Sequence, residues 1–143
     1  MNRIDAEYHC SILFEQVWTE AMILVPGLED KVLWKHYVKP TLRYVIQKSR
    51  VAGRAYYHDN VIEMNLSYAC TGSPEDMRET IAHELSHLGC FALFSRVKQA
   101  HGPEFRSIMQ CLGYAGNTYH KYDVHMAKKA VKGLRDDDVL FDL

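Results

Sequence analysis

The chain has 143 residues, of which 48% are hydrophobic and 24% charged, and this composition excludes intrinsic disorder as its main state. Its formal net charge of −1 excludes an overall positive field that would draw it to nucleic acid or to an anionic membrane. No apolar run approaches the roughly 20 residues of a membrane span, and acidic residues stand where a secretory signal has its apolar core. We therefore expect a soluble intracellular protein, cytoplasmic or associated with the nucleoid or nucleus, without a membrane partner.

Two helices are predicted in the first part of the chain. The apolar residues of positions 4–24 recur mainly at steps of three and four, which predicts one long helix that Pro26 and Gly27 end. Residues 29–38 can form a second, short helix, since their apolar residues fall on one side and Pro40 then blocks continuation.

A small sheet is predicted over residues 41–66, where short runs are rich in β-branched and aromatic residues. The turn-forming residues 58–60 separate the runs 55–57 and 61–64, so these two runs are expected to pair as an antiparallel hairpin. The strand over residues 62–66 has two interpretations. It can be an exposed sheet edge that aligns an extended substrate, or an ordinary strand of the core.

A third helix is predicted from Pro74 to about Val97, because Ser73 can cap it and proline suits its first position. The apolar residues expected on its buried side are Met77, Ile81, Leu85, Leu88, Ala92 and either Phe91 or Phe94. A further helix opens at Gly102-Pro103 and stops near Gly113.

The helix over residues 74–97 carries the pattern HExxH, formed by His83, Glu84 and His87 with two residues between. Histidines four residues apart lie on one face of a helix, about 6 Å apart along its axis, so both imidazoles can reach one ion at roughly 2.0–2.1 Å. Glu84 is turned away from direct ligation, but it can take a proton from a water on the metal and pass it to a leaving amine. The alternative is a helix with two surface histidines and a solvated glutamate.

A catalytic zinc site needs a third protein ligand. The metzincin extension would place glycine and histidine where this chain has Cys90 and Leu93, so that class is excluded. Two candidates remain, His101 and Glu104. We prefer His101, because a histidine at the start of the next helix can point back at the first, whereas an acid at position 104 already suits the helix dipole.

These residues resemble the SprT-like zinc metalloproteases. The resemblance rests on His83-Glu84-x-x-His87 followed by the run His101-Gly102-Pro103-Glu104-Phe105, and it covers roughly residues 4–113. It implies that His83, His87 and His101 bind one zinc ion and that Glu84 is the general base. It also implies a zincin-like α+β fold: a long N-terminal helix, a small, mainly antiparallel three-stranded sheet, a helix carrying HExxH, and further C-terminal helices. Members of the family are associated with cleaving proteins bound or crosslinked to DNA.

The C-terminal part departs from many bacterial members, since no paired cysteines of a zinc ribbon follow Cys111. We expect a domain over residues 1–118 and a basic, then acidic, segment over residues 119–143. The basic residues that can contact single-stranded or distorted nucleic acid are Lys121, Lys128, Lys129, Lys132 and Arg135. The alternative is a solvated amphipathic helix.

The sequence therefore predicts a zinc-dependent endopeptidase with protein substrates, for which the resemblance suggests proteins associated with or crosslinked to DNA. A zinc-stabilised module that binds nucleic acid or protein without proteolysis is the alternative. An oxyanion in the reaction needs a donor near the metal. The sequence does not choose among its candidates, which are Tyr114, Tyr119, His120, Tyr122 and His125.

Overall fold

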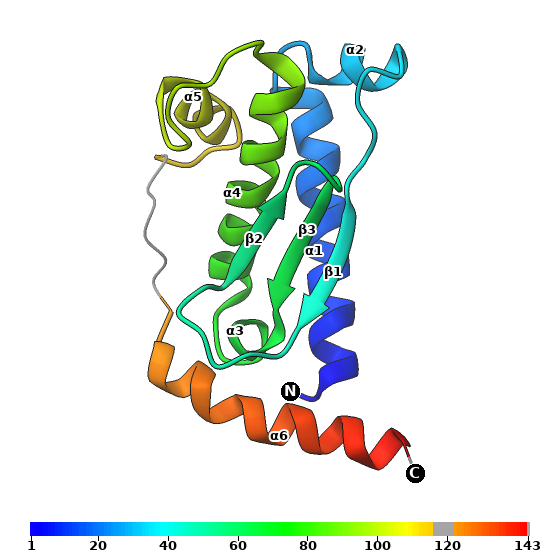
Figure 1. Cartoon of the computed structure of the whole chain (residues 1–143), viewed down its shortest axis with the longest axis vertical. Helices are drawn as coiled ribbons and strands as arrows, with labels where there is room; N and C mark the ends of the chain where they lie inside the picture. Colours follow the sequence, from blue (N-terminus) through cyan, green and yellow to red (C-terminus); the bar gives the residue numbers. More distant parts are fainter. Residues whose placement is uncertain (116–121, 143) are drawn as a thin grey trace.

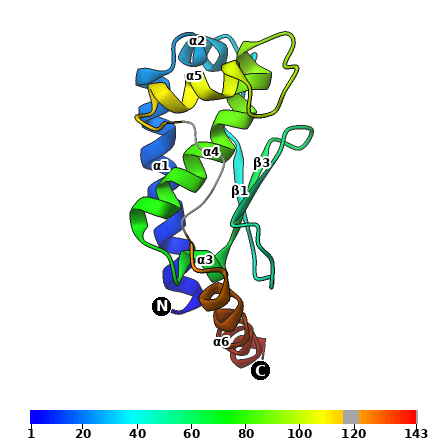
Figure 2. The same cartoon turned by 90° about the vertical axis from the view of Figure 1, so that its left-hand side faces the viewer.

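The computed structural model describes the backbone of residues 1–115 and 122–142, and the side chains of these ranges up to Arg135 (Figure 1). The chain forms helices and strands in this order: α1 (Arg3–Leu24), α2 (Leu28–Leu33), β1 (Thr41–Val45), β2 (Gly53–Tyr56), β3 (Val61–Asn65), α3 (Leu66–Ala69), α4 (Pro74–Leu93), α5 (Pro103–Cys111) and α6 (Val124–Asp142). Helices α1 and α4 pack together on one face of the sheet (Figures 1 and 2). Helices α2 and α5 lie at one end of the molecule and α6 at the other. The expected α+β class is confirmed.

The long first helix is confirmed, and its buried face is built mainly from small and medium side chains. The buried residues of α1 recur at three- and four-residue steps: Ala6, Cys10, Leu13, Phe14, Val17 and Ala21. Ile4 and Tyr8 are instead 56% and 69% exposed. The buried face of α1 therefore combines Ala6, Cys10 and Ala21 with the larger Leu13, Phe14 and Val17.

The second helix is shorter than predicted. Helix α2 ends at Leu33, and Lys35 then takes a φ of 58°, in the left-handed region that a continuing α-helix cannot adopt. Helix α4 likewise ends at Leu93, four residues before the predicted end, because Phe94 is extended. Its predicted start is confirmed: the Ser73 hydroxyl accepts a hydrogen bond from the backbone N–H of Asp76 at 3.1 Å.

The sheet is mixed, so the expectation of a mainly antiparallel sheet is wrong. The order is β1-β3-β2, with β2 and β3 antiparallel as the predicted hairpin and β1 and β3 parallel. After β1 the chain crosses to the far edge to form β2 and returns through a tight turn into the middle. The last strand of the three is therefore central and runs in the direction of the first. Strand β3 is not the exposed edge, and β2 takes that position beside α4.

The C-terminal helix packs on the same core as the rest of the chain. The buried residues of its described part, Ala127, Val131 and Leu134, lie at three- and four-residue steps, and Tyr122 is buried just before it. The proposed division at residue 118 stays a prediction. Across the part of the chain that the structure describes, no helix combines the length and the apolarity that crossing a membrane requires.

Candidate metal site

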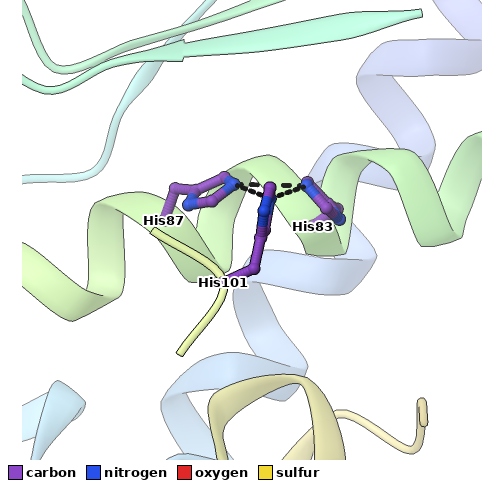
Figure 3. A group of neighbouring side chains, drawn as sticks. All are labelled: His83, His87 and His101. Atoms are coloured by element: carbon purple, nitrogen blue, oxygen red, sulfur yellow. Dashed lines mark hydrogen bonds between the residues drawn. The ribbon is translucent and has the colours of Figure 1, made fainter. Parts of the chain in front are cut away.

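Three imidazole rings converge beside the sheet (Figure 3). His83 and His87 project from one face of α4, and His101 reaches them from the loop before α5. The Nε2 atoms are 3.2 Å apart for His83 and His87, 3.1 Å for His87 and His101, and 3.2 Å for His83 and His101. These nitrogens form a nearly equilateral triangle. Among the described residues, this is the one group of three or more His, Cys, Asp or Glu side chains that can hold a metal ion.

The triangle fits a tetrahedral zinc ion. Three nitrogens at about 2.0–2.1 Å from such an ion lie roughly 3.3–3.4 Å from one another, close to the spacing observed here. Hydrogen bonds do not account for the arrangement, since each Nε2 carries at most one proton and cannot satisfy two facing nitrogens at once. A single cation accepts all three lone pairs.

The surroundings of His87 keep its imidazole ready to ligate. Burial, followed by the neighbouring His83 and His101, lowers the pKa of His87 from 6.5 to about 3. The ring is therefore neutral at pH 7, and a metal-binding imidazole must be neutral.

Two residues of the first turn of α5 support the imidazole rings. The ring of Phe105 is completely buried and contacts all three imidazoles, with centroid distances of 4.8 Å to His83, 4.5 Å to His87 and 5.0 Å to His101. The guanidinium of Arg106 donates a hydrogen bond to the His101 carbonyl oxygen at 3.1 Å, which ties the loop to the first turn of α5.

Gly89 explains how α5 comes so close to α4. A Cβ atom at this position would lie 3.3 Å from Cδ1 of Ile108 on α5. Glycine costs stability in a helix interior, and at this position it permits close packing of the helix that supports His101.

Glu84 is 8% exposed, and its carboxyl group has no protein hydrogen bond or ion pair in the described parts of the chain. Desolvation raises its pKa from 4.5 to about 7. Strand β2 passes close to Glu84, since a Cβ atom added to Gly53 would lie 3.3 Å from Cγ of Glu84. A glycine in the edge strand thus leaves room for the carboxylate arm.

The histidines and Glu84 line a cleft of about 440 Å³, and β2 and the following residue Tyr57 form its opposite wall. Three side chains of this wall were not among the candidates from sequence: Arg54, Tyr56 and Tyr57. All three carry hydrogen-bond donors. The predicted hairpin was the signal that could have identified these three residues. If its second strand is central in a three-stranded sheet, its first strand must be an edge.

Other candidate residues lie elsewhere. Glu104 is not part of the three-histidine group. It lies near Cys90, whose pKa is raised first by burial and then by the negative charge of Glu104. The oxyanion candidate Tyr122 shares a hydrogen bond with the Thr80 hydroxyl at 2.7 Å, and Tyr114 accepts one from Arg78. Neither lines the cleft, and neither does His125. Tyr119 and His120 lie outside the described residues.

The candidate nucleic-acid residues are on α6, away from the histidines. Lys128, Lys129, Lys132 and Arg135 are exposed, and Arg135 donates a hydrogen bond to the carbonyl oxygen of Ile46 at 3.0 Å. Lys121 lies outside the described residues. Helix α6 and the loop that carries His101 are at opposite ends of the molecule (Figure 1).

Fold and site together define an α+β protein with a helix-borne site of three histidines that can hold a metal ion. Comparison with known sequences narrows this class. The SprT-like family profile matches residues 25–127, and the chain belongs to this family. No solved structure matches significantly.

Individual relatives agree with this assignment. Protein SprT of Glaesserella parasuis serovar 5 is 36% identical over 91 residues, which are 63% of this chain and 57% of that protein. Protein SprT of Actinobacillus succinogenes is 34% identical over 98 residues, 68% of this chain and 54% of that protein. Protein SprT of Shewanella oneidensis is 32% identical over 93 residues, 64% and 58% of the two chains. The matched region thus spans little more than half the length of these relatives.

Proposed function

We propose that this chain is a zinc-dependent endopeptidase, with His83, His87 and His101 as the zinc ligands and Glu84 as the general base. The observation that carries the proposal is the convergence of three imidazole nitrogens in the same open cleft as a buried carboxyl group. Zinc, when bound, supplies Lewis acidity to the carbonyl under attack and to the attacking water.

The residues of the chain supply positioning and proton transfer. The three imidazoles would hold the ion through their Nε2 atoms, and the ring of Phe105 packs against all three imidazoles. Glu84 follows His83 directly on α4, so its carboxylate lies in the cleft without competing for ligation. It accepts the proton of the attacking water and delivers it to the nitrogen of the leaving amine.

Strand β2 supports binding of an extended substrate. It is one of the two edge strands of the sheet, and its side chains line the cleft opposite the histidines. An edge strand offers backbone N–H and C=O groups to which an extended peptide can add as a further strand. The substrate class we propose is therefore a polypeptide in extended conformation.

The open cleft favours catalysis over a purely structural metal site. A structural zinc site is closed by four protein ligands, whereas the described residues contribute three here.

The zinc-stabilised binding module remains the second candidate function, because the exposed lysines of α6 form a separate basic face. We propose that this face brings the enzyme to proteins associated with or crosslinked to DNA. Being remote from the histidines, it would tether the enzyme rather than contact the scissile bond.

Zinc content and proteolysis test the proposal together. The parent and Glu84→Gln are expected to bind about one zinc ion per chain, and His101→Ala to lose most of it. Glu104→Ala is the matched control and should keep its zinc. Casein and histone cleavage, with and without single-stranded DNA, should be abolished in Glu84→Gln. Cleavage by Glu84→Gln at the parental rate would refute the assignment of Glu84 as the base. Loss of zinc in Glu104→Ala with zinc retained in His101→Ala would refute the assignment of His101 as the third ligand.

The basic face has its own test. Neutralising Lys128, Lys129 and Lys132 together is expected to weaken binding of single-stranded DNA and reduce its salt dependence, while leaving casein cleavage without DNA unchanged. Unaltered DNA binding in this variant would contradict the proposed tether.

A further inference from the structure

A second cavity adjoins the metal cleft. Its volume is about 360 Å³, and it shares Tyr57, Leu88 and Phe91 with the cleft that contains the histidines. The rest of its wall combines apolar and polar residues: Lys35, His36, Tyr37, Val38, Asn60 and Ala92. The second cavity therefore adjoins the proposed active site, and the wall that the two share is aromatic and aliphatic.

A stacked aromatic pair forms the boundary between the two cavities. The rings of Tyr57 and Phe91 have centroids 4.1 Å apart and an interplanar angle of 16°. They are 50% and 52% exposed, and both line the two cavities, so the pair keeps much of its apolar surface outside the core. Covering this surface with another apolar group is favourable.

The position of Phe91 on α4 shows how far the aromatic pair lies from the bond that the metal site would cleave. Phe91 follows His87 by four residues on α4, so it lies on nearly the same face of the helix, about 6 Å further along the axis. One residue of an extended chain spans about 3.3 Å. A peptide running along the cleft therefore brings the side chain about two residues from the bond at the metal to the aromatic pair.

A hydrogen bond from the turn between β2 and β3 supports the far wall of the second cavity. The side-chain amide of Asn60, in the turn between β2 and β3, donates a hydrogen bond to the carbonyl oxygen of Val38 at 2.8 Å. Asn60 and Lys35, which both line this cavity, have φ values of 54° and 58°. Residues in such conformations persist where their surroundings hold them, and the hydrogen bond from Asn60 to Val38 is one contact that holds this wall.

We propose that the cavity behind Tyr57 and Phe91 is the specificity pocket of the enzyme. It accepts an aromatic or long aliphatic side chain of the polypeptide substrate, about two residues from the cleaved bond. This inference rests on the proposed function, since the metal defines the position of that bond. Burial of one large apolar side chain predicts a preference of about tenfold or more over alanine.

Binding to the inactive Glu84→Gln protein, loaded with zinc, tests the pocket without catalysis. Synthetic peptides carry one phenylalanine at successive positions of a glycine and serine background, with an alanine counterpart for each. We expect one position at which phenylalanine lowers Kd about tenfold or more. Ala92→Trp, which fills the cavity and leaves the aromatic pair intact, should remove this difference. Phe94→Ala is the matched control, because Phe94 is a half-exposed aromatic residue of the same region that lines neither cavity.

Cleavage sites in denatured casein, mapped by mass spectrometry for the parent enzyme, give the second readout. Enrichment of large apolar residues about two positions from the cut, lost in Phe91→Ala and kept in Phe94→Ala, supports the pocket. Cleavage without such enrichment overturns the pocket and leaves the proposed function standing. Phenylalanine-dependent binding by Glu84→Gln without any cleavage by the parent overturns the proteolytic function and supports a peptide-binding pocket. Absence of both effects overturns both.

Discussion

Replacing Glu84 by glutamine is expected to stabilise the metal-free protein at neutral and alkaline pH. The carboxyl group is almost fully buried, and its pKa rises from 4.5 to about 7 because its charged form is desolvated. A difference of one in pKa corresponds to about 1.4 kcal/mol, so the charged carboxylate costs the folded state roughly 3 kcal/mol at pH 8. Glutamine is uncharged at every pH and removes this cost.

The sign of the pH dependence follows from the raised pKa. Between about pH 4.5 and pH 7 the unfolded chain loses the Glu84 proton while the folded protein keeps it. The parent therefore loses stability relative to Glu84→Gln as pH rises through this window, and the two converge towards pH 4.5. The titration of His87 is common to both proteins and cancels to a first approximation in the difference.

Urea unfolding at pH 4.5, 6 and 8 in the presence of a chelator measures the effect. The Glu75→Gln variant is the control, since Glu75 is an exposed acid in the first turn of the same helix. Its replacement should lower stability by at most about 1 kcal/mol, through the helix dipole. Added zinc should reduce the advantage of Glu84→Gln, because a nearby cation favours the carboxylate. A Glu84→Gln protein no more stable than the parent at pH 8, or a difference that does not shrink towards acid pH, would refute the reasoning.

Three further outcomes are expected. Gly72→Ala should lower the free energy of unfolding by about 1–3 kcal/mol in urea titrations, because the new Cβ would meet the Tyr122 ring, with Cδ1 at 2.6 Å; an unchanged midpoint would show that this contact yields freely. Native protein treated with a thiol reagent at pH 8 should be modified at the half-buried Cys111 and spared at Cys10, which is buried and whose pKa is raised to about 12; peptide mapping decides the order. Zinc at a free concentration 100 times its Kd should stabilise the stripped protein by about 2.7 kcal/mol, and no shift of the unfolding midpoint would contradict binding to the folded state.

Several features of this protein could be predicted from the sequence because they depend on local geometry. The Ser73 cap and Pro74 define where α4 begins, and the spacing of His83 and His87 places both on one side of that helix. The turn at residues 58–60 likewise defines the β2–β3 hairpin. Each of these follows from bonds and contacts between residues a few positions apart.

The strand order and the rest of the cleft were decided by tertiary structure. Neighbours in sequence give no sign that β3 is the central strand with β1 parallel to it, since that order depends on how the whole chain buries its apolar surface against α1 and α4. The aromatic wall of Tyr57 and Phe91 follows from the same packing, because it joins a turn of the sheet to a helix far away in the sequence.

The third histidine shows both contributions. Its place before Pro103 made His101 a candidate from sequence, but Glu104 was a candidate too. Only the packing of α5 on α4, with Phe105 against all three rings, brings the His101 nitrogen to within 3.2 Å of the other two. Chain stiffness and hydrogen bonding act over one or two helical turns, whereas the position of a loop is set by the burial of residues from many parts of the chain.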